Sequence, residues 1–212
     1  MTHHSCRQHQ PICRLGESVS LVEAARVGVG VAHHDLDLRG AALAGNFAAG
    51  SGIDGVNPPA GVVVPFYLKD APSGFSFPIP TEPVLLDQDK CRYSPRVLGV
   101  RVGQPLQIRN SDPLLHNVRS NAVINQAFNK STPVEGMTFD HAFATREVMV
   151  PFKCDVHGWM NAYAAVLDNP FFAVTGPDGK FELKGLPPGT YTIEAWQEKL
   201  GATTASVTIG AK

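Results

Sequence analysis

The sequence predicts an all-β protein. Its 212 residues include 20 glycines and 17 prolines, roughly a sixth of the chain against about an eighth in average usage. Charged residues make up only 17%, below the roughly 25% of a typical globular protein. From residue 61 onward, short branched and aromatic runs recur at regular intervals between turns, with little helical periodicity. Such strands, regularly spaced and separated by turns, are typical of a β-sandwich.

Each expected strand is an apolar run, or an alternation of apolar and polar residues with a period of two. The expected strands occupy residues 62–64, 66–68, 97–102, 106–108, 139–143, 148–152, 162–167, 171–175, 181–183, 191–196 and 207–209. Pro65 interrupts the first two, which places them at a sheet edge or a bulge. A helix-like pattern occurs only over residues 21–26, and it is weak.

The composition divides the chain into three parts. Residues 1–60 are expected to be an N-terminal extension, either flexible or the product of a wrongly assigned start, and they show no export signal of the usual form. The linker signals Gly-Ser-Gly and Asn57-Pro58-Pro59 precede the β region. Residues 61–168 are expected to form one β domain. Residues 169–212 are expected to form a smaller β segment, too short for a core of its own, that packs on that domain or pairs with strands from about residues 61–90.

Charge and hydropathy exclude several classes of function. The net charge is −1 and the pI is about 6.7, so the chain has neither a nucleic-acid footprint nor a polybasic membrane anchor. No apolar run approaches the ~20 residues that span a bilayer, so no integral membrane segment is expected. No nucleophile–base pair or carboxylate dyad stands out, so the chain is not expected to be an enzyme.

The loop after residues 148–152 carries the most informative motif. Cys154, His157 and Met160 stand three residues apart. A thiolate, an imidazole and a thioether form a soft ligand set that suits copper and is poor for zinc. Three ligands on one tight loop do not complete a site, and His116 is a candidate for the second imidazole. Two histidines, one cysteine and a weak axial methionine are the ligands of a blue-copper electron-transfer centre. The alternative is coincidence, because buried Cys and Met are also ordinary core residues.

At these residues the sequence resembles the cupredoxins, the blue copper proteins that include amicyanin and plastocyanin. The Cys-x-x-His-x-x-Met spacing matches that of amicyanin, and Leu-His-Asn-Val at residues 115–118 resembles the segment that carries the first ligand. The resemblance covers residues 61–168 and implies a Greek-key sandwich holding one type-I copper ion. It implies His116, Cys154 and His157 as equatorial ligands and Met160 as the axial one. Asn117 would join the two ligand loops by hydrogen bonds near the cysteine sulfur.

The resemblance implies a carrier of single electrons between transient redox protein partners. His157 would be the electron port, within an apolar docking patch of Gly158, Trp159, Pro151 and Phe152. Two alternatives remain: a copper-trafficking or storage protein with the same ligands, and a secreted carbohydrate-binding-like module in which the copper loop is vestigial. Type-I copper carriers work outside the cytoplasm, so a periplasmic or extracellular location is expected.

Three further features have expected roles. Cys91 is interpreted as a buried structural thiol, with pairing to Cys6 or Cys13 as the less favoured alternative. His141 is interpreted as a packed or surface histidine. Residues 169–212 resemble the end of carboxypeptidase-regulatory-like (transthyretin-like) β domains, a likeness that does not establish sugar binding. Trp196 in that segment is expected to pack in the sheet.

Overall fold

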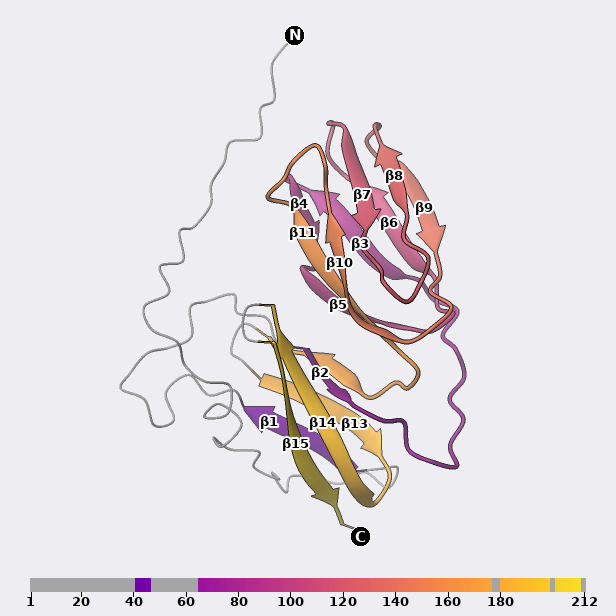
Figure 1. Cartoon of the computed structure of the whole chain (residues 1–212), viewed down its shortest axis with the longest axis vertical. Helices are drawn as coiled ribbons and strands as arrows, with labels where there is room; N and C mark the ends of the chain where they lie inside the picture. Colours follow the sequence, from indigo (N-terminus) through magenta and orange to yellow (C-terminus); the bar gives the residue numbers. More distant parts are fainter. Residues whose placement is uncertain (1–40, 47–64, 177–179, 199–200, 211–212) are drawn as a thin grey trace, which may run out of the picture. The chain divides into compact units, whose positions relative to one another are not determined.

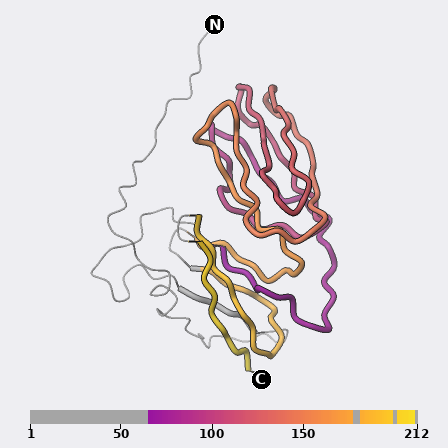
Figure 2. The backbone as a smooth tube through the Cα atoms, in the orientation of Figure 1, coloured from indigo at the N-terminus to yellow at the C-terminus, as the bar shows by residue number. Residues whose placement is uncertain are grey.

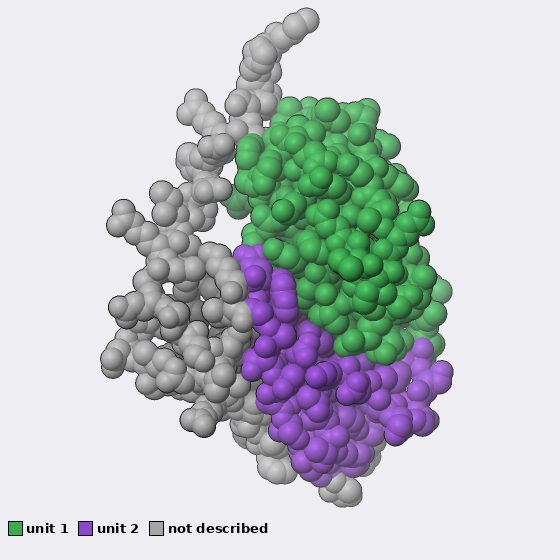
Figure 3. Space-filling model, viewed as in Figure 1, with its two compact units in different colours: residues 1–16, 78–168 green, residues 17–77, 169–212 purple. Residues whose placement is uncertain are grey.

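The computed structural model describes residues 41–46, 65–176, 180–198 and 201–210. The chain divides into two compact units, which are described separately below (Figure 3). Within the described residues, unit 1 covers residues 78–168. Unit 2 combines residues 41–46 and 65–77 with those from 169 onward, so residues 65–77 group with the C-terminal segment rather than with the strands that follow them. The described residues contain no helix that could cross a membrane.

Unit 1 consists of two β-sheets (Figure 1). The first sheet has the order β5-β11-β10-β7-β8 and the second has the order β4-β3-β6-β9. Neighbours are antiparallel except for the parallel pairs β5–β11 and β3–β6. The strands are β3 (Val84–Asp89), β4 (Arg92–Ser94), β5 (Val97–Arg101), β6 (Leu106–Asn110), β7 (His116–Ser120), β8 (Asn129–Thr132), β9 (Thr138–His141), β10 (Glu147–Lys153) and β11 (Asn161–Leu167).

The two sheets of unit 1 share one hydrophobic core. In β6 the residues alternate between buried and half-buried, so Leu106 and Ile108 face inward, as the period of two predicts. Their partners in the core include Val150 and Phe152 from β10 in the other sheet. Apolar side chains from both sheets therefore fill one layer, which is the arrangement of a β-sandwich. The predicted all-β sandwich class is confirmed.

Hydrogen bonds join three loops of unit 1. The β10–β11 loop is joined to the β3–β4 turn by the Trp159 indole N–H, which donates to the Cys91 carbonyl. The β3–β4 turn donates two backbone N–H groups to Asp112, which lies in the β6–β7 loop. The β10–β11 loop is closed by the Cys154 N–H donating to the Met160 carbonyl at 3.3 Å and the Met160 N–H donating to the His157 carbonyl at 2.9 Å. Figure 2 shows the course of the backbone through the strands and loops of unit 1. The strand order thus brings residues from about 90, 112 and 157 to one place.

Unit 2 is also built of strands. The sheet order is β12-β2-β14-β15, and β1 pairs with β13. The strands are β1 (Ala41–Asn46), β2 (Pro65–Leu68), β12 (Phe172–Val174), β13 (Lys180–Leu186), β14 (Gly189–Gln197) and β15 (Gly201–Ile209). In β14, Ile193 and Ala195 are buried on one face, as the alternation predicts, and Trp196 is half-buried.

The pairing of β2 with β14 fits one of the two arrangements expected for the C-terminal segment. Strand β1 lies inside the expected N-terminal extension. The rest of that extension, including the helix-like pattern over residues 21–26, lies outside the described residues.

A buried carboxylate secures the loop between β7 and β8. Glu147, at the start of β10, is only 6% exposed. It accepts hydrogen bonds from the backbone N–H of Val123 at 2.6 Å and of Asn125 at 2.8 Å, and from the Asn125 amide at 2.9 Å. Burial alone would raise the pKa of Glu147, but these donors outweigh it and the pKa is lowered. The ionised carboxylate therefore stabilises the fold.

The Glu147→Gln variant should lose about 1–3 kcal/mol of unfolding free energy at neutral pH, because the loop donors lose their charged acceptor. The folded-state pKa of Glu147 lies below its ordinary value of 4.5, so its contribution is fully present above that value. The contribution is lost as the pH falls through the folded-state pKa. Denaturant unfolding of both proteins should show their stabilities converging in acid. A stability difference that stays constant into strong acid would contradict this account.

Candidate metal centre

His116 occupies the first position of β7 and is fully buried. It pairs with Thr132 of β8, so the sheet ladder fixes its backbone. Its Nε2 lies 2.8 Å from Oδ2 of Asp112, four residues earlier in the chain. A carboxylate only accepts hydrogen bonds, so Nε2 carries the proton and donates it. The other ring nitrogen, Nδ1, is therefore the one that remains available to a ligand.

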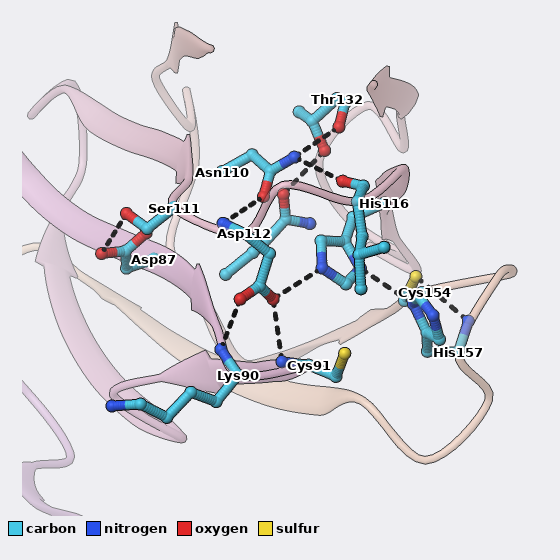
Figure 4. A network of polar contacts seen from close by, with 12 residues as sticks. Asp87, Lys90, Cys91, Asn110, Ser111, Asp112, His116, Thr132, Cys154 and His157 are labelled. Atoms are coloured by element: carbon cyan, nitrogen blue, oxygen red, sulfur yellow. Dashed lines mark hydrogen bonds and ion pairs between the residues drawn. The ribbon is translucent and has the colours of Figure 1, made fainter. Parts of the chain in front are cut away.

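The Asp112 carboxylate connects His116 to the β3–β4 turn (Figure 4). It accepts the N–H of Lys90 at 2.7 Å and the N–H of Cys91 at 2.8 Å. Both turn residues have left-handed backbones, with φ of 52° and 55°. Asn110 in turn accepts the N–H of Asp112 at 2.9 Å. Asp112 is thus held on several sides and orients the His116 ring.

His157 faces His116 from the β10–β11 loop. The two Nδ1 atoms are 2.9 Å apart and the ring centroids are 4.7 Å apart. Burial lowers the pKa of His157, and the neighbouring His116 lowers it further. For His116, burial alone would lower the pKa, but hydrogen bonds with Cys154 and Asp112 outweigh it and the pKa is raised. The two Nδ1 atoms therefore face each other at a position where one metal ion could bind both rings.

Cys154 supplies a sulfur next to the same rings. It is 3% exposed and is the free cysteine among the described residues. Its Sγ accepts the His157 N–H at 3.3 Å. Burial raises the pKa of the thiol, but hydrogen bonds from the His116 ring and from the backbone of Asn117, His157 and Val156 outweigh it, and the pKa is lowered. The surroundings of the sulfur thus favour the thiolate, which is the form that binds metals.

Asn117 joins strand β7, which carries His116, to the β10–β11 loop, which carries His157. Its Oδ1 accepts the N–H of Asp155 at 2.6 Å, and its Nδ2 donates to Asp155 Oδ2 at 3.0 Å. The Asn117 backbone N–H donates to the Cys154 sulfur. The Asn117 carbonyl accepts the Tyr93 hydroxyl at 2.7 Å and the Gln88 amide at 3.4 Å. The Asn117 side chain is therefore hydrogen-bonded to the residue that follows Cys154.

Cys91 also lies close to the two histidines. One sulfur and one nitrogen from each histidine, in the set Cys91, His116 and His157, all lie within 4.8 Å of one another. However, Cys91 is disulfide-bonded, so its sulfur carries no thiolate, whereas Cys154 is free. Cys154 is therefore the described cysteine whose sulfur is available to a metal ion. The interpretation of Cys91 as a free structural thiol was wrong, because four cysteines allow several pairings that spacing cannot rank. Cys6 and Cys13 lie outside the described residues.

The other residues expected at the site differ in how exposed they are. Met160 is 1% exposed and lies in the same core cluster as Cys154. Trp159 is half-buried, and its indole N–H donates to the Cys91 carbonyl at 3.1 Å. Phe152 is fully buried, so its assignment to an exposed docking patch was wrong. The reason is that Phe152 points from β10 into the core between the sheets.

The large apolar side chains exposed beside the histidines are instead Leu115 and Val156, each 48% exposed. Sequence reasoning missed both, although each immediately precedes one of the two histidines. It also missed Asp112, whose signal was an acidic residue four positions before His116. His141 is half-buried between Phe128 and Phe143, which agrees with a packed histidine.

No protein-family model matches the chain, and no curated protein matches it. Among solved structures, the chain is similar to a copper-containing nitrite reductase from Thermus scotoductus, with 17% identity and a TM-score of 0.39, over 47% of this chain and 25% of that one. It is similar to a purple cupredoxin from Nitrosopumilus maritimus, with 24% identity and a TM-score of 0.35, over 40% of this chain and 99% of that one.

An oxidised variant of amicyanin is similar over 49% of this chain and 91% of its own, with 21% identity and a TM-score of 0.36. These likenesses are partial and distant. The proposals below therefore rest on the side chains of the site.

The Asp112→Asn variant should bind Cu(II) about ten- to a hundredfold more weakly, because an amide holds the His116 N–H less firmly than a carboxylate does. Competition with a coloured chelator measures the affinity. Asp87→Asn is the matched control, because Asp87 accepts the Ser111 hydroxyl at 2.8 Å and pairs with Arg109 beside the same loop. Equal loss of affinity in both variants would show that Asp112 has no specific role in orienting His116.

Proposed function

We propose that the chain is a type-I (blue) copper protein that carries single electrons between redox partners. The observation that carries this proposal is the convergence of three donors. The Nδ1 atoms of His116 and His157 face each other at 2.9 Å, and the Cys154 sulfur is hydrogen-bonded to the His116 ring. Two imidazoles and one thiolate are the equatorial donors of a blue-copper site.

The residues fit a copper ion in chemistry as well as in position. The lowered pKa of Cys154 favours the thiolate, and the lowered pKa of His157 favours the neutral imidazole. Met160 is buried in the same core cluster as Cys154 and would supply a weak thioether donor. A bound copper ion would supply the electron transfer by alternating between Cu(II) and Cu(I). The chain is proposed as a carrier and not as an enzyme.

The buried donors favour a carrier over a trafficking or storage protein. His116, Cys154 and Met160 are 0%, 3% and 1% exposed. Strands β3 and β4 of one sheet donate hydrogen bonds to the backbone next to His116 in the other sheet. Such a rigid set limits rearrangement when the charge of the metal changes. A trafficking protein needs donors that exchange readily, so it would be expected to keep more of them at the surface.

His157 is the donor nearest to solvent, because its ring is only half-buried. Leu115 and Val156, each 48% exposed, flank the two histidines. Electron-transfer partners dock through small interfaces, so a modest apolar surface of this kind suffices for transient redox partners. We propose His157 as the electron port and these two side chains as part of its contact surface.

The disulfide bond of Cys91 supports a periplasmic or extracellular location. Disulfides persist in oxidising compartments and are rare in the reducing cytosol. A blue-copper carrier outside the cytoplasm agrees with this chemistry.

The Cys154→Ser variant should lose the intense blue absorption that the wild-type apoprotein is expected to develop on addition of Cu(II), since a serine hydroxyl cannot replace the thiolate. Absorption spectra and metal analysis of both proteins measure this. The Cys91→Ser variant is the matched control and should keep the colour. Colour that survives in Cys154→Ser and disappears in Cys91→Ser would overturn the ligand assignment in favour of Cys91.

A further inference from the structure

The residue after Cys154 is an acid whose charge is held in a defined place. The carboxylate of Asp155 accepts the Asn117 amide at 3.0 Å and the Asn129 amide at 2.9 Å, both at Oδ2. Its Oδ1 lies 3.1 Å from Nη2 of Arg119. Strand β7 supplies Asn117 and Arg119, and β8 supplies Asn129. Two neighbouring strands thus fix the position of this carboxylate.

The bridge between the loops does not require this charge. The Asp155 backbone N–H already donates to Asn117 Oδ1 at 2.6 Å, and any neutral oxygen could accept the two amide hydrogen bonds. The negative charge therefore adds an electrostatic effect to a contact that a neutral side chain could make. Arg119 forms an ion pair with the same carboxylate, so its positive charge partly opposes the electrostatic effect of Asp155.

The charge of Asp155 acts on the interior of the site. Burial is the largest cause of the raised pKa of Tyr93, and the charges of Cys154 and Asp155 both raise it further. The Tyr93 hydroxyl donates to the Asn117 carbonyl, directly after His116 in the chain. The field of Asp155 therefore reaches a buried group beside the proposed ligands. The side chains of Asp155 and Arg119 are 40% and 42% exposed, so solvent screens this field in part.

We infer that the Asp155–Arg119 pair sets the reduction potential of the copper centre, an inference that rests on the proposed function. Cu(II) carries one more positive charge than Cu(I), so a fixed negative charge nearby stabilises Cu(II) preferentially and lowers the potential. Asp155 accordingly lowers the potential and Arg119 raises it. Both are tuning residues whose charges act on the metal through space, without binding it.

The test is a redox titration at an electrode, which supplies the electron that reduces Cu(II) to Cu(I), on the full chain loaded with copper. Asp155→Asn keeps the shape of the side chain and removes its charge. It should raise the potential and shift the equilibrium toward Cu(I) by about five- to thirtyfold, as expected for one partly screened charge. Arg119→Gln should shift the potential in the opposite direction, and Arg119→Lys should leave it near the wild-type value. Each shift should shrink as the salt concentration rises.

Glu147→Gln is the matched control, because Glu147 is also a hydrogen-bonded carboxylate but lies at the other end of β10, about 20 Å along the strand from the loop. It should lower stability without moving the potential. Shifts of the same sign in Asp155→Asn and Arg119→Gln, or no shift in either, would overturn the inference while wild-type blue absorption remains. Absence of that absorption in the wild type would instead remove the proposed function. If Asp155→Asn fails to fold, the sign of the Arg119→Gln shift decides.

Discussion

The contact between Asp112 and His116 is the interaction on which the geometry of the site depends. The ring could place either nitrogen toward a metal, and the carboxylate fixes the choice because it occupies Nε2. The same carboxylate accepts the N–H groups of Lys90 and Cys91, whose left-handed backbones cost about 1–3 kcal/mol each. One side chain therefore stabilises an otherwise unfavourable turn and orients a histidine. The direction of His116 Nδ1 follows from this arrangement.

The site is continuous with the core of unit 1. Cys154 and Met160 belong to the same hydrophobic cluster as Val150 and Phe152, which face the opposite sheet. Any displacement of the sulfur side chains would disturb the packing between the two sheets, and close-packed interiors resist such displacement. The rigidity of the site is thus a property of the sandwich rather than of the short loop alone.

Polar side chains connect the strands beneath the site. Their polarity is the reason that one of these strands, β3, was not predicted from the sequence. Strand β3 was not predicted, because Asp87, Gln88 and Asp89 read as a polar segment. In the structure Gln88 is fully buried, accepts the Thr132 hydroxyl at 2.7 Å and donates to the Asn117 carbonyl. A glutamine can lie in a protein core when its side chain is hydrogen-bonded, although its polarity alone would predict an exposed position.

The sequence by itself determined the all-β class, the alternation of strands such as β6, and the grouping of Cys154, His157 and Met160 on one loop as candidate donors. These depend on periodicity and on spacing within one loop, which are local properties of the chain. Only the tertiary structure decided which of two nearby cysteines is free, which nitrogen of His116 faces the site, and that Asp112 and Asp155 are the carboxylates beside it. Asp112 reaches Cys91 across 21 residues of sequence and Asn117 reaches Asp155 across 38, and the order of the strands in the sheets brings such distant segments together.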